Sequence, residues 1–546
     1  MTRTRKRRIA AAIAAVAAAA AIAAVFCGLW ASGAFLPSWT AWDSFSLEID
    51  LDKDGDAETM VLADRHLAIR DAEGAEAYRS PDEWHVFDAT AADIDRDGAL
   101  ETVALVWKRG SFGEARPFWI EKNDEEFSQH IFVFRYGDGA LEPVWMSSAV
   151  DFEIRGGYVD ERERLHIEQP DGGEILLEWD SWGFAFLDES AQAAADAAAL
   201  APDGAGAVTL AAAGDVIPHE LVVASAWDDE ERAYDFSALF APVAGLLGEC
   251  DLAAVNQEAP FAPDDAHVSD YPLFGAPAAL CDALAAAGFD IVTAATNHAL
   301  DQGAAGVMGT IEEWRAYPQV TLLGLHASAT DADAVAYRKA NDMRFALFNL
   351  SYGLNAGPLG EEDAYLVDTL DDEGRILGQL QAVERDGSAD LSVCFVHAGE
   401  EYAAGPTEEQ RALAERLIDA GADAVICTHA HVVQPCETVS TPAGNKGIVC
   451  WSLGNFAASQ GSPETSIGAV ALLAADRDGK GLARFRSCRL VPSICHIDRT
   501  GDGGAVYLLS DYTEELARAN AAAVPSADET VSLHDLWRIW HARAGA

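Results

Sequence analysis

Basic residues are scarce in this sequence. The 37 lysines and arginines stand against 89 aspartates and glutamates, and the formal net charge at pH 7 is -52. Nucleic-acid binding depends on basic patches that neutralise phosphates, so this charge balance argues against nucleic acid as a partner. It predicts a soluble, self-repelling surface. An anionic substrate should be repelled unless cations or local arginines and histidines reverse the field at the site.

Paired cysteine motifs are also missing. None of the nine cysteines has the C-x-x-C spacing of a structural zinc site. Most lie in apolar surroundings, as Cys394 does, which is typical of a small buried hydrophobic residue. An exported location would permit disulfides, and Cys488 and Cys495 are then a candidate pair that the sequence does not decide.

One segment lacks charge altogether. The basic run Arg3–Arg8 is followed by 22 uncharged residues, Ile9–Trp30. That length spans a bilayer as a helix, and the basic flank should stay in the cytoplasm. The competing interpretation is a cleaved signal peptide, although the apolar part of such peptides is usually only about 7–15 residues long. We therefore expect residues 1–40 to be a basic tail and signal-anchor in the cell membrane, a single-pass arrangement with the rest of the chain extracytoplasmic.

The 546 residues are enough for two or more domains. Residues 44–190 show short alternating strands with Gly and Asp turns, and 191–206 change to an Ala, Asp and Gly linker. Strands and helices then alternate over 207–500, which predicts a layered α/β domain, before a poorly patterned C-terminal extension at 501–546. The fold class is thus an α/β domain preceded by a small, mostly β domain.

An acidic pattern occurs twice in the β-rich region, 43 residues apart. Alternate carboxylates closed by a glycine can wrap oxygen ligands around one Ca²⁺. The pattern resembles the loops of FG-GAP or VCBS-type β-propeller repeats, although two copies would not close a propeller. Solvated acidic turns without metal are the alternative. The candidate calcium ligands are Asp50, Asp52, Asp54 and Glu58 in the first copy, and Asp93, Asp95, Asp97 and Glu101 in the second.

Buried strands and amphipathic helices are readable in the α/β region. The expected strands are Val208–Ala213, Leu252–Val255, Ile291–Ala295, Phe345–Leu350, Leu391–Val396, Ala424–Cys427 and Gly447–Trp451. The expected helices are Phe236–Gly248, Pro277–Ala287 and Glu408–Ala420. Side chains at the carboxyl ends of such strands are held rigidly and still reach solvent, so chemistry is expected there.

Polar residues do follow six of these strands in turn. They are Asp215, Glu258, Asn297 with His298, His397 with Glu401, His429 with His431, and Asn455. Carboxylate, amide and imidazole together are the ligand set for one or two divalent ions such as Mn²⁺, Fe²⁺ or Zn²⁺. Each motif is weak alone, since Asn297-His298 followed by Asp301 could equally be a helix cap.

As a series, these motifs resemble the CapA family over residues 207–460. They are Gly214-Asp215, Asn256-Gln257-Glu258-Ala259-Pro260, Ala295–Gly303, His397–Tyr402, Thr428–His431 and Ser452–Phe456. The resemblance implies a calcineurin-like metallophosphatase fold and a role in poly-γ-glutamate capsule biosynthesis with other capsule synthesis proteins. The implied metal ligands are Asp215, Glu258, Asn297, His397, His429 and His431. His298 would be the general acid or the donor to developing charge, with Asp301 and Glu401 orienting histidines.

The sequence departs from the usual family pattern at Thr296, Ala398, Thr428 and Ala430, all of which leave the candidate ligands intact. The first motif has no Asp-x-His pair, so one metal is better supported than two. His219, four residues after Asp215, is a candidate for the missing histidine, but Pro218 leaves the direction of its side chain open. Two further functions remain open. One is a non-catalytic component that anchors or exports an anionic polymer, and the other is an exported phosphoesterase unrelated to capsule.

Overall fold

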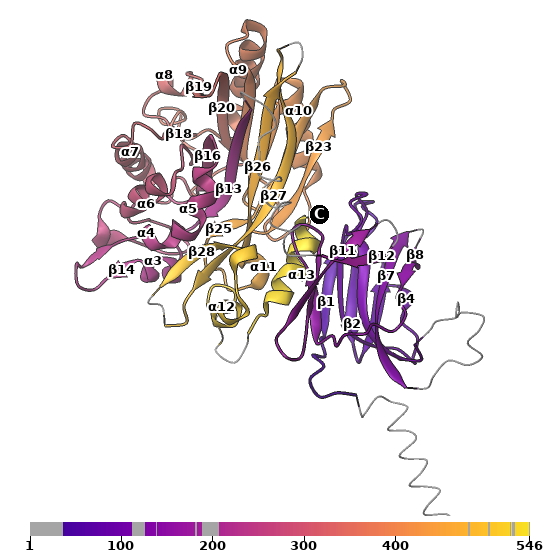
Figure 1. Ribbon diagram of the computed structural model, residues 1–546. Coiled ribbons are helices and arrows are strands. Elements are labelled where there is room, and N and C mark those ends of the chain that lie inside the picture. Colours follow the sequence, from indigo (N-terminus) through magenta and orange to yellow (C-terminus); the bar gives the residue numbers. More distant parts are fainter. Residues whose placement is uncertain are drawn as a thin grey trace, which may run out of the picture.

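The computed structural model describes residues 36–111, 126–137, 139–180, 183–187, 207–478, 481–500, 503–524, 526 and 530–544 (Figure 1). The predicted membrane segment Ile9–Trp30 and the predicted linker 191–206 lie outside these ranges. Within them, no helix is both long enough and apolar enough to cross a membrane.

The N-terminal region forms three antiparallel sheets of four strands each, with strands adjacent in chain order. The first sheet contains β1 (Phe45–Ile49), β2 (Glu58–Ala63), β3 (His66–Arg70) and β4 (Glu76–Arg79). The second contains β5 (His85–Ala92), β6 (Glu101–Arg109), β7 (Phe127–Gly137) and β8 (Ala140–Met146), and the third β9 (Gly156–Val159), β10 (Leu165–Glu168), β11 (Glu174–Asp180) and β12 (Gly183–Phe186).

The middle sheet is buried on both faces. Along β6, Ala104 and Val106 belong to the core shared with the first sheet, whereas Val103 and Leu105 belong to the core shared with the third. Successive residues of a strand point to opposite faces, so a strand between two cores is apolar at nearly every position. The almost continuous apolar run of β6 follows from this placement.

The second region contains two sheets that pack face to face. The first has the order β18-β17-β16-β13-β26-β27-β28, with β25 paired to β13, and the second has the order β19-β20-β21-β22-β24-β23. The first sheet comprises β13 (Val208–Val216), β16 (Leu252–Gln257), β17 (Ile291–Thr293), β18 (Thr321–Leu323), β25 (Asn455–Ala457), β26 (Ile467–Arg477), β27 (Ala483–Ile497) and β28 (Gly504–Leu508). The second comprises β19 (Ala336–Ala340), β20 (Met343–Ser351), β21 (Leu391–His397), β22 (Ala424–Thr428), β23 (Val433–Ser440) and β24 (Lys446–Leu453).

Helices cover the outer faces of both sheets (Figure 1). A core between the sheets joins residues such as Leu210 and Phe345, and two further cores lie under the helices on either side. The first outer face carries α3 (Glu220–Ser225), α4 (Ser237–Phe240), α5 (Ala244–Gly248), α6 (Ala279–Ala287) and α7 (Gly303–Trp314), and the second carries α9 (Glu373–Asp386) and α10 (Glu408–Asp419). Shorter helices are α8 (Ala329–Ala332), α11 (Pro463–Ser466) and α12 (Glu514–Ala519), and a hairpin pairs β14 (Trp227–Asp228) with β15 (Ala233–Tyr234). The layered α/β architecture predicted from the alternating pattern is confirmed.

The helix predicted over Phe236–Gly248 is wrong as a continuous element. It is divided into α4, a 3-10 turn at Ala241–Val243 and α5. Pro242 lies in the first turn of the 3-10 segment. Because proline has no backbone N–H and its ring clashes with the preceding turn, it interrupts an α-helix that would otherwise continue.

The strand directions bring the predicted site residues to one edge. Strands β13, β16 and β17 are parallel to one another, as are β20, β21, β22 and β24 in the other sheet. Their carboxyl ends, where the polar motifs lie, therefore gather at one edge of each sheet, and the two sheets are stacked.

The last helix, α13 (Leu533–Ala544), packs against the N-terminal sheets as well as against the second region. The Arg538 guanidinium donates to the Ala89 carbonyl and pairs with Asp43 and Asp88. His541 Nε2 lies 2.6 Å from the Val159 carbonyl oxygen. These contacts join the two regions through a buried, charged helix face.

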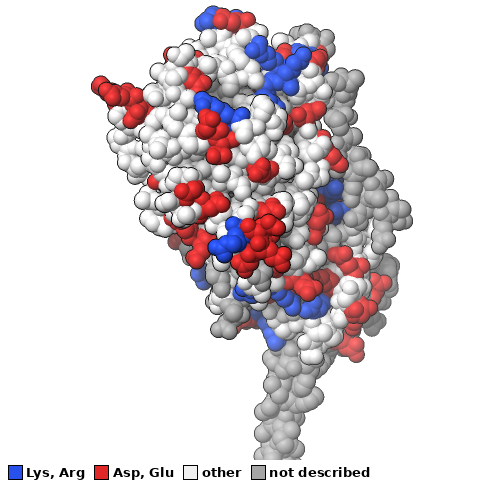
Figure 2. Space-filling view, turned by 90° about the vertical axis from the view of Figure 1, so that its left-hand side faces the viewer, with Lys and Arg blue, Asp and Glu red and all other residues white. Residues whose placement is uncertain are grey.

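The surface agrees with the composition. Figure 2 shows the side of the second region covered by helices, where Asp and Glu side chains are widely spread and gather in one dense patch around a few basic residues. This face of the domain that carries the candidate site is therefore predominantly acidic. Any anionic ligand must meet a local cation to approach it.

Candidate metal centre

The predicted ligands come together from both sheets. Asp215 lies in β13, Glu258 follows β16, His397 ends β21, and His429 and His431 follow β22. All five side chains are buried, and Asp215 and His397 are fully inaccessible. Buried charges and imidazoles gathered in this way need a partner that neutralises them.

Glu258 is at the centre of the group. Its Oε1 lies 3.7 Å from His397 Nε2 and 3.9 Å from His431 Nε2. Asp215 Oδ2 lies 3.5 Å from His431 Nδ1. Among the described residues, the ligand atoms that lie within 4.8 Å of one another include the sets Glu258, His397 and His429; Asp215, Glu258 and His431; and Glu401, His429 and His431.

Several of these ligand atoms have no hydrogen-bond partner. Both carboxylate oxygens of Glu258 and Nδ1 of His429 are buried and unsatisfied. An unpaired buried carboxylate is costly, and a cation bound between it and the histidines would remove the cost. Oxygen and imidazole donors without a thiol suit a divalent ion of the Mn²⁺, Fe²⁺ or Zn²⁺ type. The donor set therefore fits such an ion.

The pKa values of the ligand side chains are shifted by the same burial. Burial and the neighbouring Asp215 raise the pKa of Glu258 well above its ordinary value, although His431 opposes this. Burial lowers the pKa of His397 well below its usual range and that of His429 to about 4. Burial would also lower the pKa of His431, but Glu258 and Asp215 outweigh it and raise the pKa to about 9. His397 and His429 are thus neutral at pH 7, the form that binds metal.

Amide and hydroxyl groups fix the orientation of the ligands. Asn297 Oδ1 lies 2.8 Å from His397 Nε2, and the Thr428 hydroxyl lies 2.9 Å from His397 Nδ1. The Asn455 Oδ1 lies 3.1 Å from His431 Nδ1, which leaves Nε2 of that ring facing Glu258. The Asn455 contact therefore holds His431 in the tautomer that can bind a metal through Nε2.

Two of these orienting residues were not predicted as part of the site. Asn256 donates from Nδ2 to Asp215 Oδ1 at 2.7 Å and accepts from the Thr293 hydroxyl. Thr428 was noted only as a departure from the family pattern. The available signal was position, since Asn256 stands two residues before Glu258 and Thr428 directly before His429.

The backbone around the two histidines is strained. His429 has φ 98° and His431 has φ 60°, in the left-handed region that side chains other than glycine seldom adopt. The neighbouring strands also touch closely, because a Cβ on Gly214 would lie 2.0 Å from the Gly454 carbonyl oxygen. Strain of this kind persists where the surrounding structure over-determines it, which is common at functional sites.

His298 and Asp301 form a pair beside the ligands. His298 Nδ1 lies 2.7 Å from Asp301 Oδ2, which also accepts the backbone N–H of Phe274. The His298 ring packs edge-on against Phe274. Asp301 thus holds the His298 ring through Nδ1, and the opposite nitrogen, Nε2, lies 3.4 Å from Asn355 Nδ2.

Glu401 lies within ligand distance of two site histidines, whereas the hydrogen bond described for His219 is to the backbone. Glu401 is exposed, yet its carboxylate belongs to a ligand-distance set with His429 and His431. It is therefore placed to contact an ion or a substrate directly as well as to orient a histidine. His219 Nδ1 accepts the Ser459 backbone N–H at 3.3 Å.

The two acidic loops fold alike, but their carboxylates have different partners. The Asp50 and Asp93 carboxylates each accept N–H groups from the fourth and fifth following residues. In the second loop, Arg135 pairs with Asp95, Asp97 and Glu101. In the first loop, Asp52 Oδ1 is buried without a hydrogen-bond partner, as is Glu101 Oε2 in the second. Among the described residues, however, no arginine pairs with the first loop's carboxylates as Arg135 does with those of the second. The Arg135 guanidinium thus already pairs with the second set of candidate calcium ligands.

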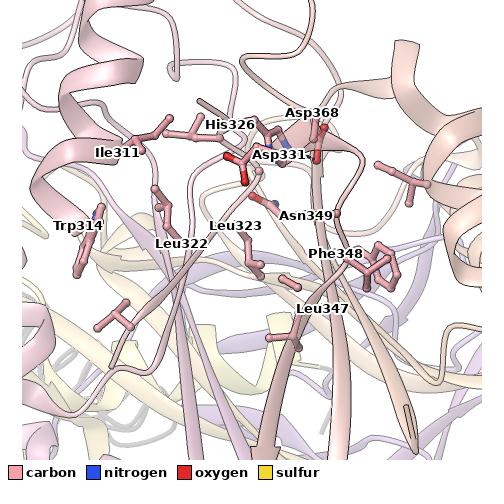
Figure 3. Close-up of a pocket in the computed structure, with 18 of the residues that line it drawn as sticks. Ile311, Trp314, Leu322, Leu323, His326, Asp331, Leu347, Phe348, Asn349 and Asp368 are labelled. Atoms are coloured by element: carbon pink, nitrogen blue, oxygen red, sulfur yellow. Dashed lines mark hydrogen bonds and ion pairs between the residues drawn. The ribbon is translucent and has the colours of Figure 1, made fainter. Parts of the chain in front are cut away.

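A separate cavity of about 440 Å³ opens between β18 and β20 (Figure 3). His326, Asp331 and Asp368 are among its polar lining residues, and Leu322, Leu347 and Phe348 are among its apolar ones. Asn349 also reaches it, and its Oδ1 accepts the backbone N–H groups of Ala294 and Ala295. One wall of this cavity therefore supports the loop that presents Asn297 and His298.

Comparison with known proteins gives one family. Residues 209–460 match the family described as "Bacterial capsule synthesis protein PGA_cap". The chain is 31% identical over 186 residues to the capsule biosynthesis protein CapA of Bacillus anthracis, covering 34% of this chain and 44% of that protein. It is 30% identical over 194 residues to the PGA biosynthesis protein CapA of Bacillus subtilis, covering 35% and 49%. The chain therefore spans about half the length of these relatives.

Among solved structures, sulfate thiohydrolase SoxB of Thermus thermophilus is similar at 14% identity and a TM-score of 0.30, covering 59% of this chain and 50% of that one. At that score the likeness carries no argument about function.

Proposed function

Because residues 209–460 match the bacterial capsule synthesis family, we propose that this chain is a membrane-anchored, extracytoplasmic capsule biosynthesis protein with a metal-dependent hydrolase site. The substrate class is an anionic polymer of the poly-γ-glutamate type or a phosphoester. The observation that carries the proposal is the buried cluster of three histidines and two carboxylates in which both oxygens of Glu258 lack a partner.

Asp215, Glu258, Asn297, His397, His429 and His431 would hold the ion. A divalent ion bound by them would supply Lewis-acid chemistry at a substrate oxygen. The protein's own part is to keep these ligands buried and oriented, since Asn256, Thr428 and Asn455 each hold one ligand in place. The burial of the cluster also strengthens every electrostatic contact made there.

His298 is the proposed general acid. The Asp301 carboxylate holds its Nδ1, and the opposite nitrogen, Nε2, lies 3.4 Å from Asn355 Nδ2 at the edge of the cluster. When the ring is an imidazolium balanced by the Asp301 carboxylate, its second proton is on Nε2 and can pass to the leaving group as its bond breaks. Glu401, which is exposed beside His429 and His431, is placed to contact substrate.

The membrane anchor rests on the sequence alone. The uncharged segment Ile9–Trp30 behind Arg3–Arg8 supports a single-pass arrangement with the acidic domains outside the cytoplasm. Such a placement would bring the site to a polymer at the cell surface, together with other capsule synthesis proteins.

The full chain loaded with Mn²⁺ is expected to cleave a generic phosphodiester or poly-γ-glutamate, and removal of the metal with a chelator should abolish the rate. A His298→Asn variant should keep its metal and lose about 10²–10⁴-fold in rate, because only proton transfer is removed. Release of nitrophenol or new polymer ends would be followed alongside metal content.

Metal retained with no turnover of either substrate would favour a polymer-anchoring or export component instead. Cleavage of the phosphodiester alone would favour an exported phosphoesterase unrelated to capsule.

Calcium binding in the N-terminal region is proposed for the first loop only. Ca²⁺ should raise the melting temperature of the full chain, and Asp52→Ala should remove this shift because Asp52 offers an unpartnered oxygen. Asp95→Ala, the matched change in the second loop, should leave the shift in place because Arg135 already pairs with those carboxylates. Equal loss of the shift in both variants, or no shift in the parent, would contradict this assignment.

A further inference from the structure

Three cysteine side chains meet between the two sheets of the second region. Cys436 on β23 and Cys450 on β24 are direct partners in the antiparallel register, and Cys488 comes from β27 of the facing sheet. The Cys450 Sγ lies 2.9 Å from the Cys436 Sγ and 3.5 Å from the Cys488 Sγ. All three sulfur atoms lie within 4.8 Å of one another.

This cluster replaces the cysteine pair that the sequence offered as a candidate. Cys495 is a free thiol in the core beneath the outer helices, whereas Cys488 packs at the margin of the core between the sheets. The two residues are seven apart on the same strand, so their side chains point to opposite faces. A Cys488–Cys495 disulfide is therefore excluded by the fold.

We propose that Cys436, Cys450 and Cys488 form a binding site for one thiophilic monovalent ion, Cu(I). Thiolate ligands select soft ions such as Cu(I), whereas the carboxylate and imidazole donors of the candidate metal centre select harder ones. Among the described residues, the set consists of three cysteine sulfur atoms with no carboxylate or imidazole among them. Structural zinc almost always takes four ligands, so a three-sulfur set suits Cu(I) better.

The position of the cluster allows an ion to enter. Cys450 is fully buried, but Cys436 and Cys488 are partly exposed residues, so the cluster lies at the margin of the core. Each thiol that binds the ion releases its proton to water. The bound ion would connect strands of both sheets and so stabilise the folded state against separation of the two layers.

The test is a competition for Cu(I) between the full chain and a coloured Cu(I) chelator, without oxygen and with a phosphine reductant present. The parent protein should withhold one equivalent of Cu(I) from the chelator. Cys488→Ser and Cys436→Ser should each weaken binding at least about 100-fold, because each removes one of three ligands. Cys281→Ser, a change at a buried cysteine outside the cluster, should leave it unchanged.

A second measurement separates this site from the histidine centre. The His429→Ala/His431→Ala variant should withhold the same single equivalent of Cu(I), and X-ray absorption should show a copper shell of sulfur only. Copper withheld equally by Cys488→Ser and the parent would overturn the proposal, as would nitrogen in the copper shell. A Cys436–Cys450 disulfide that persists in the reductant would also overturn it, because two of the three ligands would be missing.

Discussion

Replacement of both His429 and His431 by alanine is expected to lower the affinity for Mn²⁺ or Zn²⁺ by at least about 100-fold, since even the partners of metal-binding histidines contribute about 10–100-fold. The two rings lie on strained backbone, within ligand distance of Glu258 or Glu401. Their loss leaves Asp215 and Glu258 without the imidazoles that complete each ligand set. Metal content after dialysis and calorimetric titration would measure the change.

His326→Ala is the matched control, because His326 pairs with Asp368 in the separate cavity of Figure 3 and not with the cluster. It should retain full metal content. If the double variant bound metal as tightly as the parent, the assignment of the ion to this cluster would be wrong, whatever the activity of the protein.

Glu258→Gln is expected to have opposite effects with and without metal. In the metal-free protein, burial and Asp215 raise the pKa of Glu258 well above its ordinary value of 4.5. A carboxyl whose pKa is raised on folding destabilises the folded state above its unfolded pKa, and the cost grows until the pH passes the folded value. The neutral amide removes this cost, so the variant should melt higher at pH 7, by about 2–4 °C for each kcal/mol gained, and show no gain near pH 4.

With metal present the sign should reverse. The parent gains stability from the bound ion, whereas the variant lacks the carboxylate shared by two of the ligand sets and should gain little. Melting curves at pH 4 and pH 7, with and without Mn²⁺, would show both effects. Glu401→Gln is the matched control, because Glu401 is exposed and should give no stabilisation in the metal-free protein. A metal-free Glu258→Gln protein that melts lower at pH 7 would contradict the assigned charge imbalance.

The strand-end residues were predictable because local pattern determines where a buried strand stops. Asp215, Glu258, His397 and His429 each follow an apolar run, and parallel strands place their ends together. The sequence did not predict which of these residues come within ligand distance of one another. That depends on the pairing of β13 with β16 and on the stacking of the two sheets, which join residues far apart in the sequence. The hydrogen bond between Asn297 and His397, 100 residues apart, is of this kind.

Other features were not predicted, in one case despite an apolar run at 467–475. The strands β26 and β27 form the longest pairing in the second region, yet no element was expected at Ile467–Ile497. The cysteine cluster depends on that strand, because β27 alone carries Cys488 to the facing sheet. The spacing of the cysteines in the sequence could not predict this cluster, since Cys436, Cys450 and Cys488 meet only through strand pairing and sheet stacking.

The docking of α13 has a consequence for synthesis of the protein on the ribosome. The helix supplies Arg538 to Ala89, a contact between residues 449 positions apart. At about 5–20 residues per second, the N-terminal sheets leave the ribosome tens of seconds before this helix is made. During that interval the buried Asp88 has neither Arg538 nor His534 beside it. A nascent chain should therefore hold its first three sheets in a less stable state until α13 emerges, and chaperones would meet that state first.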